Sequence, residues 1–194
     1  MGKELKAIKE TVNHREQLTR NLNIRILGLP FSEDESLGPD ASAAAAKQAY
    51  DRIVRPLLVA AKAKGIITTL PSIANTITHA YRLKFRTQSN QPTLPPLIVT
   101  LQSPNIKMAV FRAKKDALPV PSATEKAARS LRFTVTEDLT SHTAAFLKLL
   151  RENAKVSRAW SVDGSIRYIL EGDSNNIIHR VRSVYDPIES VLPK

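Results

Sequence analysis

The chain of 194 residues contains no cysteine, which excludes disulfides, thiolate zinc sites and cysteine nucleophiles. It has no apolar run near the roughly 18 residues that a membrane-spanning helix needs. Its first ten residues form a charged segment without the apolar stretch of a signal peptide. We therefore expect a soluble intracellular protein.

Acidic residues are missing from one long stretch of the chain. None occurs between Asp51 and Asp116, although that window holds eleven Lys and Arg, as many as the net charge of +11. Charges that only keep a surface soluble usually alternate in sign, so this pattern favours a binding surface for a polyanion over a merely solvated surface. The eleven cations are Arg52, Arg55, Lys62, Lys64, Arg82, Lys84, Arg86, Lys107, Arg112, Lys114 and Lys115.

Hydrophobic residues make up 42% of the chain and charged residues 24%, which is typical of a folded protein and allows one domain or two small ones. Leu5, Ile8 and Val12 follow heptad spacing and predict the end of a coiled coil, about three heptads long, in residues 1–21. Residues 22–137 form a second segment, and residues 138–194 form a third.

The middle segment alternates between strand and helix patterns. We expect strands at 23–30, 77–86, 97–101 and 131–136. A helix capped by Asp40 or Ser42 precedes Pro56, which either kinks it or begins a second helix ending at Gly65. Another helix opens at Ser103-Pro104 and runs to about Asp116. The resulting βαββαβ order is the split βαβ arrangement that RNA recognition motifs also use.

The last segment predicts a small α+β domain. Asp138 or Thr140 caps a helix, and Asp163-Gly164 is a strong signal for a two-residue β-hairpin turn. A final helix is expected from about Asn175 to Pro187. The predicted fold class is therefore α+β, with a short coiled-coil helix, an RNA-recognition-motif-like domain and a C-terminal domain containing a hairpin. The expected apolar residues of the two helices are Phe146, Leu149, Leu150, Ile177, Val181 and Val184, with His179, Arg180 and Arg182 towards solvent.

Two groups of residues are candidates for nucleic-acid binding. RNA recognition motifs stack bases on aromatic residues of their central strands, but strand 97–101 has none. Contact with phosphates through a basic row on the strands should therefore dominate. In the hairpin, Trp160 is expected opposite Arg167, with Arg158 on the same face, as a base-stacking platform; packing of this Trp in a small core is the alternative. The basic row comprises Arg82, Lys84, Arg86 and Arg132.

Signals for enzymatic chemistry are weak. The four histidines have no metal-ligand spacing, and the six glycines form no phosphate-binding loop. Asp138, Ser141 and His142 are close in sequence, but capping of a helix explains the first two better than a catalytic triad does. We predict no catalytic residue, no metal and no cofactor.

Four strings of residues, in order and with the right spacing, resemble the first-open-reading-frame protein of LINE-type retrotransposons, an RNA-binding, transposase-22-like family. They extend over most of the chain, from about Arg20 to Pro187. The strings are RNLNIRILGLP at 20–30, LIV at 97–99, KMAVFRAKK at 107–115 and LRFTVTEDLT at 131–140.

The resemblance implies a trimerising coiled coil, a non-standard RNA recognition motif and a small C-terminal domain. It further implies a protein that coats the element's own RNA and acts as a nucleic-acid chaperone, without catalysing covalent chemistry. The implied partners are single-stranded RNA and DNA, other copies of the chain, and the element's reverse transcriptase, in a ribonucleoprotein of the cytoplasm and also the nucleus. The implied RNA contacts are Arg20, Arg25, Arg82, Arg86, Arg112, Lys114, Lys115 and Arg132.

The leading hypothesis is thus binding of single strands with little sequence preference. A structural assembly protein that binds an acidic partner through its basic face is the alternative, and a cryptic nuclease is a third.

Overall fold

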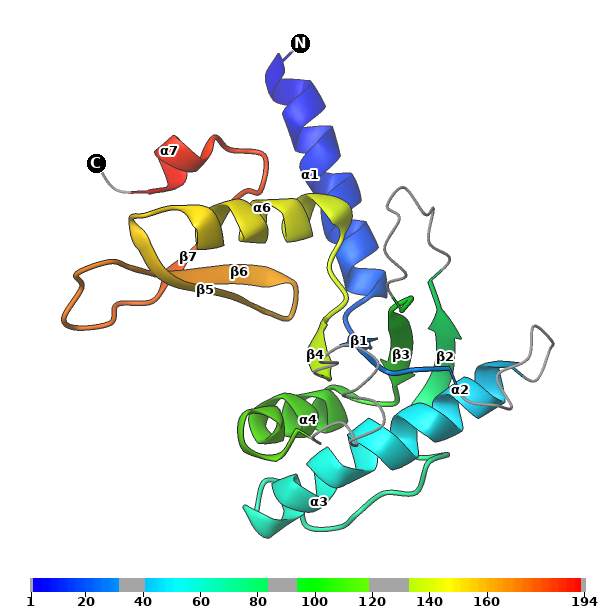
Figure 1. Cartoon of the computed structure of the whole chain (residues 1–194). Coiled ribbons are helices and arrows are strands. Elements are labelled where there is room, and N and C mark those ends of the chain that lie inside the picture. Colours follow the sequence, from blue (N-terminus) through cyan, green and yellow to red (C-terminus); the bar gives the residue numbers. More distant parts are fainter. Residues whose placement is uncertain (1, 32–40, 84–93, 119–132, 193–194) are drawn as a thin grey trace. The chain divides into compact units, whose positions relative to one another are not determined.

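The computed structural model describes residues 2–31, 41–83, 94–118 and 133–192 (Figure 1). It is an α+β structure, as the sequence predicts. The chain divides into two compact units. We call Leu22–Thr136 the four-stranded unit, and Met1–Asn21 together with Glu137–Lys194 the three-stranded unit. Every helix in the described ranges is too short or too polar to cross a membrane.

The four-stranded unit contains an antiparallel sheet in the order β2-β3-β1-β4. Its element order is the strand, helix, strand, strand, helix, strand order expected from the sequence. β3 occupies a central position, as its apolar residues on both faces predict. The strands are β1 (Asn23–Leu27), β2 (Ile77–Arg82), β3 (Leu97–Leu101) and β4 (Thr134–Glu137).

Two helical segments connect these strands. The first comprises α2 (Ala41–Ala49), a π-helical turn (Tyr50–Val54) and α3 (Arg55–Ala63), which run on from one another (Figure 1). Pro56 stands in the first turn of α3, but Ala49, Val54 and Arg55 all have helical φ and ψ, so the helix runs through this proline and a second helix does not begin there. The π turn just before Pro56 is where the regular hydrogen-bond pattern of the helix is interrupted. The second segment is α4 (Pro104–Ala117), which Ser103 caps by accepting a hydrogen bond from the Ile106 N–H. Ser42 lies inside α2 and is not its cap.

Both helical segments contribute to the core of the four-stranded unit. Ile24 and Ile26 of β1 pack with Val99 and Leu101 of β3, and all four are fully buried. These residues alternate along their strands, so one face of the sheet carries the hydrophobic core. The helices supply the remaining core side chains, among them Ile53, Leu57, Leu58, Ala109, Val110 and Ala113.

The three-stranded unit places a helix on an antiparallel sheet in the order β5-β6-β7. Thr140 caps α6 by accepting a hydrogen bond from the Thr143 N–H at 3.3 Å, whereas Asp138 does not cap it. Phe146 and Leu150 are buried as expected, but Leu149 is 53% exposed, and Leu147 takes its place in the core. The elements are α1 (Gly2–Thr19), α6 (Ser141–Glu152), β5 (Val156–Val162), β6 (Ser165–Leu170), β7 (His179–Arg180) and α7 (Ile188–Val191).

Helix α1 has two different faces. One contacts the rest of its unit through polar groups: Lys6 pairs with Asp186, and the buried Gln17 bonds the backbone at Asp138 and Thr140. The opposite face is apolar and exposed, at the spacing of a coiled-coil seam. We call this second face the α1 stripe; it consists of Leu5, Ile8 and Val12, which are 54%, 61% and 58% exposed.

Candidate nucleic-acid interface

The outer face of the three-stranded sheet carries one aromatic residue between cations. Trp160 lies directly opposite Arg167, and Arg167 lies directly opposite Arg180 on the third strand. Side chains at directly opposite positions share a sheet face, so these three form one row across the sheet. We call it the Trp160 row. Among the described residues, the core cluster of this unit does not include Trp160, so its indole does not pack there.

The hairpin pairs Trp160 with Arg167 as the sequence predicts. Asp163 and Gly164 both adopt positive φ, 49° and 73°, the conformation that a two-residue type I′ turn requires. Arg158 lies opposite Ile169, two positions before Trp160, and projects from the same outer face. Ile166 and Tyr168 point to the inner face and are buried against α6.

Tyr168 anchors the inner face of this sheet. Its hydroxyl donates a hydrogen bond to the Val191 carbonyl at 2.8 Å, and its ring stacks on His179 with 5.1 Å between centroids. Burial raises the pKa of the Tyr168 phenol above its usual value of 10.0, because the charged form would be desolvated. These contacts hold β6 and β7 beneath the Trp160 row.

Arg180 is a member of the row that the sequence reasoning missed, because a helix was predicted from Asn175. That prediction is wrong: this segment forms a turn and β7. Asn176 has a φ of 51°, and the Asp173 carboxylate accepts hydrogen bonds from the N–H groups of Asn175 and Ile177, so the chain turns.

Strand β7 is too short to carry a strong periodic signal. The only alternation there spans three residues, Arg180-Val181-Arg182, with a single apolar residue. Val181 is buried as expected, whereas Ile177 is 54% exposed. Pro187 precedes α7 and does not end a helix.

Arg82 does not belong to an exposed basic row. The register shifts between Ile77 and His79, so Ala80 and Arg82 face the core side of β2 and the alternation is inverted from the expected one. The Arg82 guanidinium donates to the carbonyls of Leu29 and Pro30, at 2.7 and 2.6 Å. It also donates to the Pro95 carbonyl at 3.1 Å and lies 4.6 Å from the centroid of the Phe31 ring. Arg82 therefore stabilises the fold of its unit.

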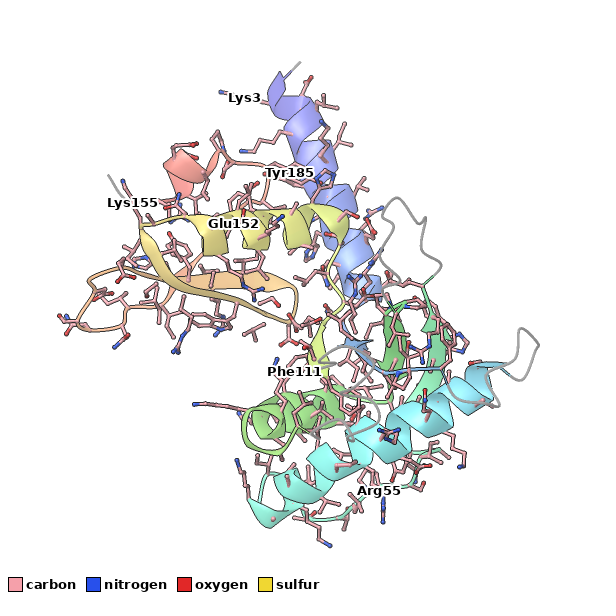
Figure 2. All side chains as sticks on the ribbon, in the orientation of Figure 1. Lys3, Arg55, Phe111, Glu152, Lys155 and Tyr185 are labelled. Atoms are coloured by element: carbon pink, nitrogen blue, oxygen red, sulfur yellow. The ribbon has the colours of Figure 1, made fainter. Side chains whose placement is uncertain are left out.

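Helix α4 separates its cations into two groups. Lys114 donates to the Val135 carbonyl at 3.0 Å, and its Nζ lies 4.6 Å from the centroid of the Phe111 ring, labelled in Figure 2. Lys107 is only 4% exposed and lies over the same ring. Arg112 and Lys115 are exposed, so they are the α4 cations that can reach a phosphate.

The remaining predicted RNA contacts differ in how far the structure describes them. Arg20 is held by an ion pair with Glu16 at 2.6 Å and by Asp138 and the Leu139 carbonyl, which ties it to its own unit. Arg25 is half-buried on β1, opposite Ile98. Lys84, Arg86 and Arg132 lie outside the described residues.

The charge divides unevenly between the units. The four-stranded unit contains 16 Lys and Arg against 7 Asp and Glu, a net charge of +9, whereas the three-stranded unit has 13 against 11, or +2. The four-stranded unit therefore contributes most of the long-range electrostatic attraction that this chain exerts on a polyanion. Its described cations that are exposed are Lys47, Arg55, Lys62, Lys64, Arg112 and Lys115.

The three-stranded sheet thus holds a half-buried tryptophan and a half-buried Arg167 on one face, with the exposed Arg158 and Arg180 on the same face. In the described ranges, no three His, Asp or Glu side chains are close enough to hold a metal ion. No protein-family model matches this sequence, and no curated protein is significantly similar to it.

Proposed function

We propose that this protein binds single-stranded RNA and DNA with little sequence preference. The Trp160 row carries the proposal. An indole can stack on any base because every base has a π face, and the guanidinium groups next to it, Arg167 and Arg180 across the sheet and Arg158 along β5, can bind the phosphates between successive bases. Neither contact reads the edge of a base, so sequence selectivity is low.

Chaperone activity follows from the same chemistry. Each stacking or phosphate contact is weak on its own, so a strand can leave one contact while the others hold. Strands bound in this way can melt and pair again without leaving the protein. On this proposal the protein packages retrotransposon RNA into a ribonucleoprotein, as the resemblance to LINE first-open-reading-frame proteins implies, and works without a catalytic residue or cofactor.

The strand order supports our proposal that the four-stranded unit has an RNA-recognition-motif-like fold. In an RNA-recognition-motif-like fold, the two central strands are the first and third, as β1 and β3 are here. The α1 stripe supports self-association, because its three large apolar side chains at heptad spacing would be buried against the same stripe of another copy in a coiled coil. We propose a homo-oligomer, which is a trimer where the coil is longer, and the element's reverse transcriptase as a further partner.

The test is a salt titration of binding to single-stranded oligonucleotides, read by the fluorescence of Trp160, the only tryptophan. We expect the fluorescence to be quenched on binding, and the logarithm of affinity to fall steeply with the logarithm of salt. Arg167→Gln should flatten the slope by about 0.7, the value for one phosphate contact on a single strand, and should weaken all sequences alike. Lys148→Gln, exposed on α6, is the matched control. Affinity that does not depend on salt contradicts the proposal.

A structural assembly protein that binds an acidic protein remains the second candidate, and the α1 stripe favours it. Replacing Leu5, Ile8 and Val12 together by Ser should convert oligomers to monomers in analytical ultracentrifugation. The two functions separate when these monomers are tested with RNA. RNA binding by these monomers supports the nucleic-acid-binding function. If the unmodified chain binds no single strand at all, the assembly function is the one that remains.

A further inference from the structure

Strand β2 exposes a pair of aromatic rings at the edge of the four-stranded sheet. His79 and Tyr81 both point away from the core, because the shift in register after Ile77 turns Ala80 inward. Their ring centroids are 5.5 Å apart, and Tyr81 is 40% exposed. Exposed aromatic pairs on a sheet are uncommon in a chain with so few aromatic residues, so this pair is a candidate for binding.

The orientation of His79 is set by Ser42. The Ser42 hydroxyl donates its one proton to the Ala80 carbonyl at 2.9 Å, so it acts as an acceptor towards His79 Nδ1, 3.1 Å away. Nδ1 therefore carries the proton, and in the neutral ring Nε2 is the acceptor. Within the described part of the chain, no hydrogen bond occupies Nε2. The histidine thus offers a fixed acceptor beside the tyrosine ring.

The neighbouring strands extend this pair into two rows. Tyr81 lies opposite Ile98, and Ile98 lies opposite Arg25 on β1. His79 lies opposite Thr100, whose hydroxyl donates to the Asn23 side-chain oxygen at 2.8 Å. Ile98 is fully buried and Asn23 is 8% exposed, so the exposed ends of both rows are His79 and Tyr81 on β2. Neither row contains an acid.

We propose that His79 and Tyr81 form a second base-stacking site, which takes one nucleobase of a single-stranded nucleic acid. The base stacks on Tyr81, and His79 Nε2 accepts a hydrogen bond from an N–H group of the base. This inference rests on the proposed function. It moves the aromatic contact of the four-stranded unit from the central strands, where RNA recognition motifs have it, to the edge strand.

Two observations favour a nucleic acid over a peptide as the occupant. The unit that carries the pair has a net charge of +9, which attracts a phosphate backbone. Ser42 already binds the carbonyl of Ala80 on the edge strand, so a peptide strand added there would have to displace it. Stacking on the exposed rings requires no such displacement.

The experiment compares two fluorescent oligomers of equal length on the full chain, a deoxyadenosine homopolymer and its abasic analogue. Tyr81→Leu should lower affinity for the base-bearing oligomer about five- to thirtyfold and leave affinity for the abasic oligomer unchanged. Tyr81→Phe is the matched control; it keeps the ring and should bind as the unmodified chain does. Thermal unfolding by circular dichroism confirms that both variants are folded.

The outcomes separate this inference from the proposed function. If the unmodified chain binds neither oligomer, both proposals fail. If Trp160→Leu weakens binding but Tyr81→Leu does not, or if Tyr81→Leu weakens both oligomers equally, only the second site is overturned. A change of oligomeric state in Tyr81→Leu without nucleic acid would assign the pair to a protein contact, and would also overturn it.

Discussion

The hydrogen bonds of Gln17 provide a quantitative test of how α1 is held to its unit. The Gln17 side chain is buried, donates to the Asp138 carbonyl at 3.1 Å and accepts from the Thr140 N–H at 3.0 Å. Gln17→Ala removes both bonds and leaves the N–H of Thr140, which is 1% exposed, without its partner. At about 0.5–1.5 kcal/mol for each of the two bonds and about 1–3 kcal/mol for the orphaned group, the expected loss of unfolding free energy is about 2–6 kcal/mol.

Gly164 in the hairpin turn lies against the same side chain. A Cβ at this position would lie 2.3 Å from Gln17 Cγ and 2.8 Å from Cδ, and the backbone has a φ of 73°. Gly164→Ala should therefore cost about 1–2 kcal/mol for the left-handed conformation and about 1–3 kcal/mol for the overlap. Gln17→Ala removes the atoms that would overlap with the new Cβ, but it does not change the unfavourable left-handed backbone conformation of residue 164. The double variant should thus lose about 1–3 kcal/mol less than the sum of the single losses, which is the cost of the overlap.

Urea denaturation followed by Trp160 fluorescence measures these losses, because the only tryptophan lies in the same unit. Arg15→Ala, an exposed change on the same helix, is the control and should stay within about 0.5 kcal/mol of the unmodified chain. Single losses that add within about 0.5 kcal/mol would refute the overlap. A Gln17→Ala loss no larger than that of Arg15→Ala would refute the role of Gln17 itself.

Two further predictions concern residues that anchor each unit. Arg82→Ala should cost the four-stranded unit about 2–4 kcal/mol, because several charge-assisted bonds to carbonyls are lost together; thermal unfolding by circular dichroism tests this, and a melting temperature equal to that of Arg112→Ala contradicts it. Burial raises the pKa of Tyr168, so the folded state holds the phenol proton more tightly and stability should fall as pH rises past about 10. Tyr168→Phe should lower the free energy of unfolding by about 0.5–1.5 kcal/mol at neutral pH, because the hydrogen bond to Val191 is lost. Above pH 10 the unfolding free energy of this variant, measured by urea denaturation, should fall less steeply with pH than that of the unmodified chain; an equally steep fall would disprove the role of the phenol.

Local signals in the sequence were sufficient where neighbouring residues decide the structure. The Asp163-Gly164 turn, the Ser103 cap and the apolar strand Leu97–Leu101 each depend on residues within a few positions, and each is present as predicted. The hairpin turn alone also sets the pairing of Trp160 with Arg167. Two of the three residues of the Trp160 row, Trp160 and Arg167, were therefore predictable from the sequence.

Local signals failed where a distant contact decides the outcome. The alternation in strand 77–86 is real, but a one-residue shift in pairing with β3 decides which face is buried. That shift turns Arg82 from an expected phosphate contact into a partner of backbone carbonyls, and it exposes His79 and Tyr81. Arg180 was missed for a related reason, since a two-residue strand is specified by its partner β6 and not by its own residues.

The sequence by itself determined the α+β class, the order of the elements in the four-stranded unit, the coil-like stripe on α1 and the excess of positive charge, because composition and periodicity are properties of the chain. Only the tertiary structure decided which cations are available. Guanidinium and ammonium groups bind whatever acceptors lie nearest, and for Arg20, Arg82 and Lys114 those acceptors are in the protein. Arg112 and Lys115 stay exposed because helix packing leaves their face of α4 uncovered, whereas in the Trp160 row the Arg167 side chain is half-buried and Arg180 donates a hydrogen bond to the Ser165 hydroxyl at 3.0 Å.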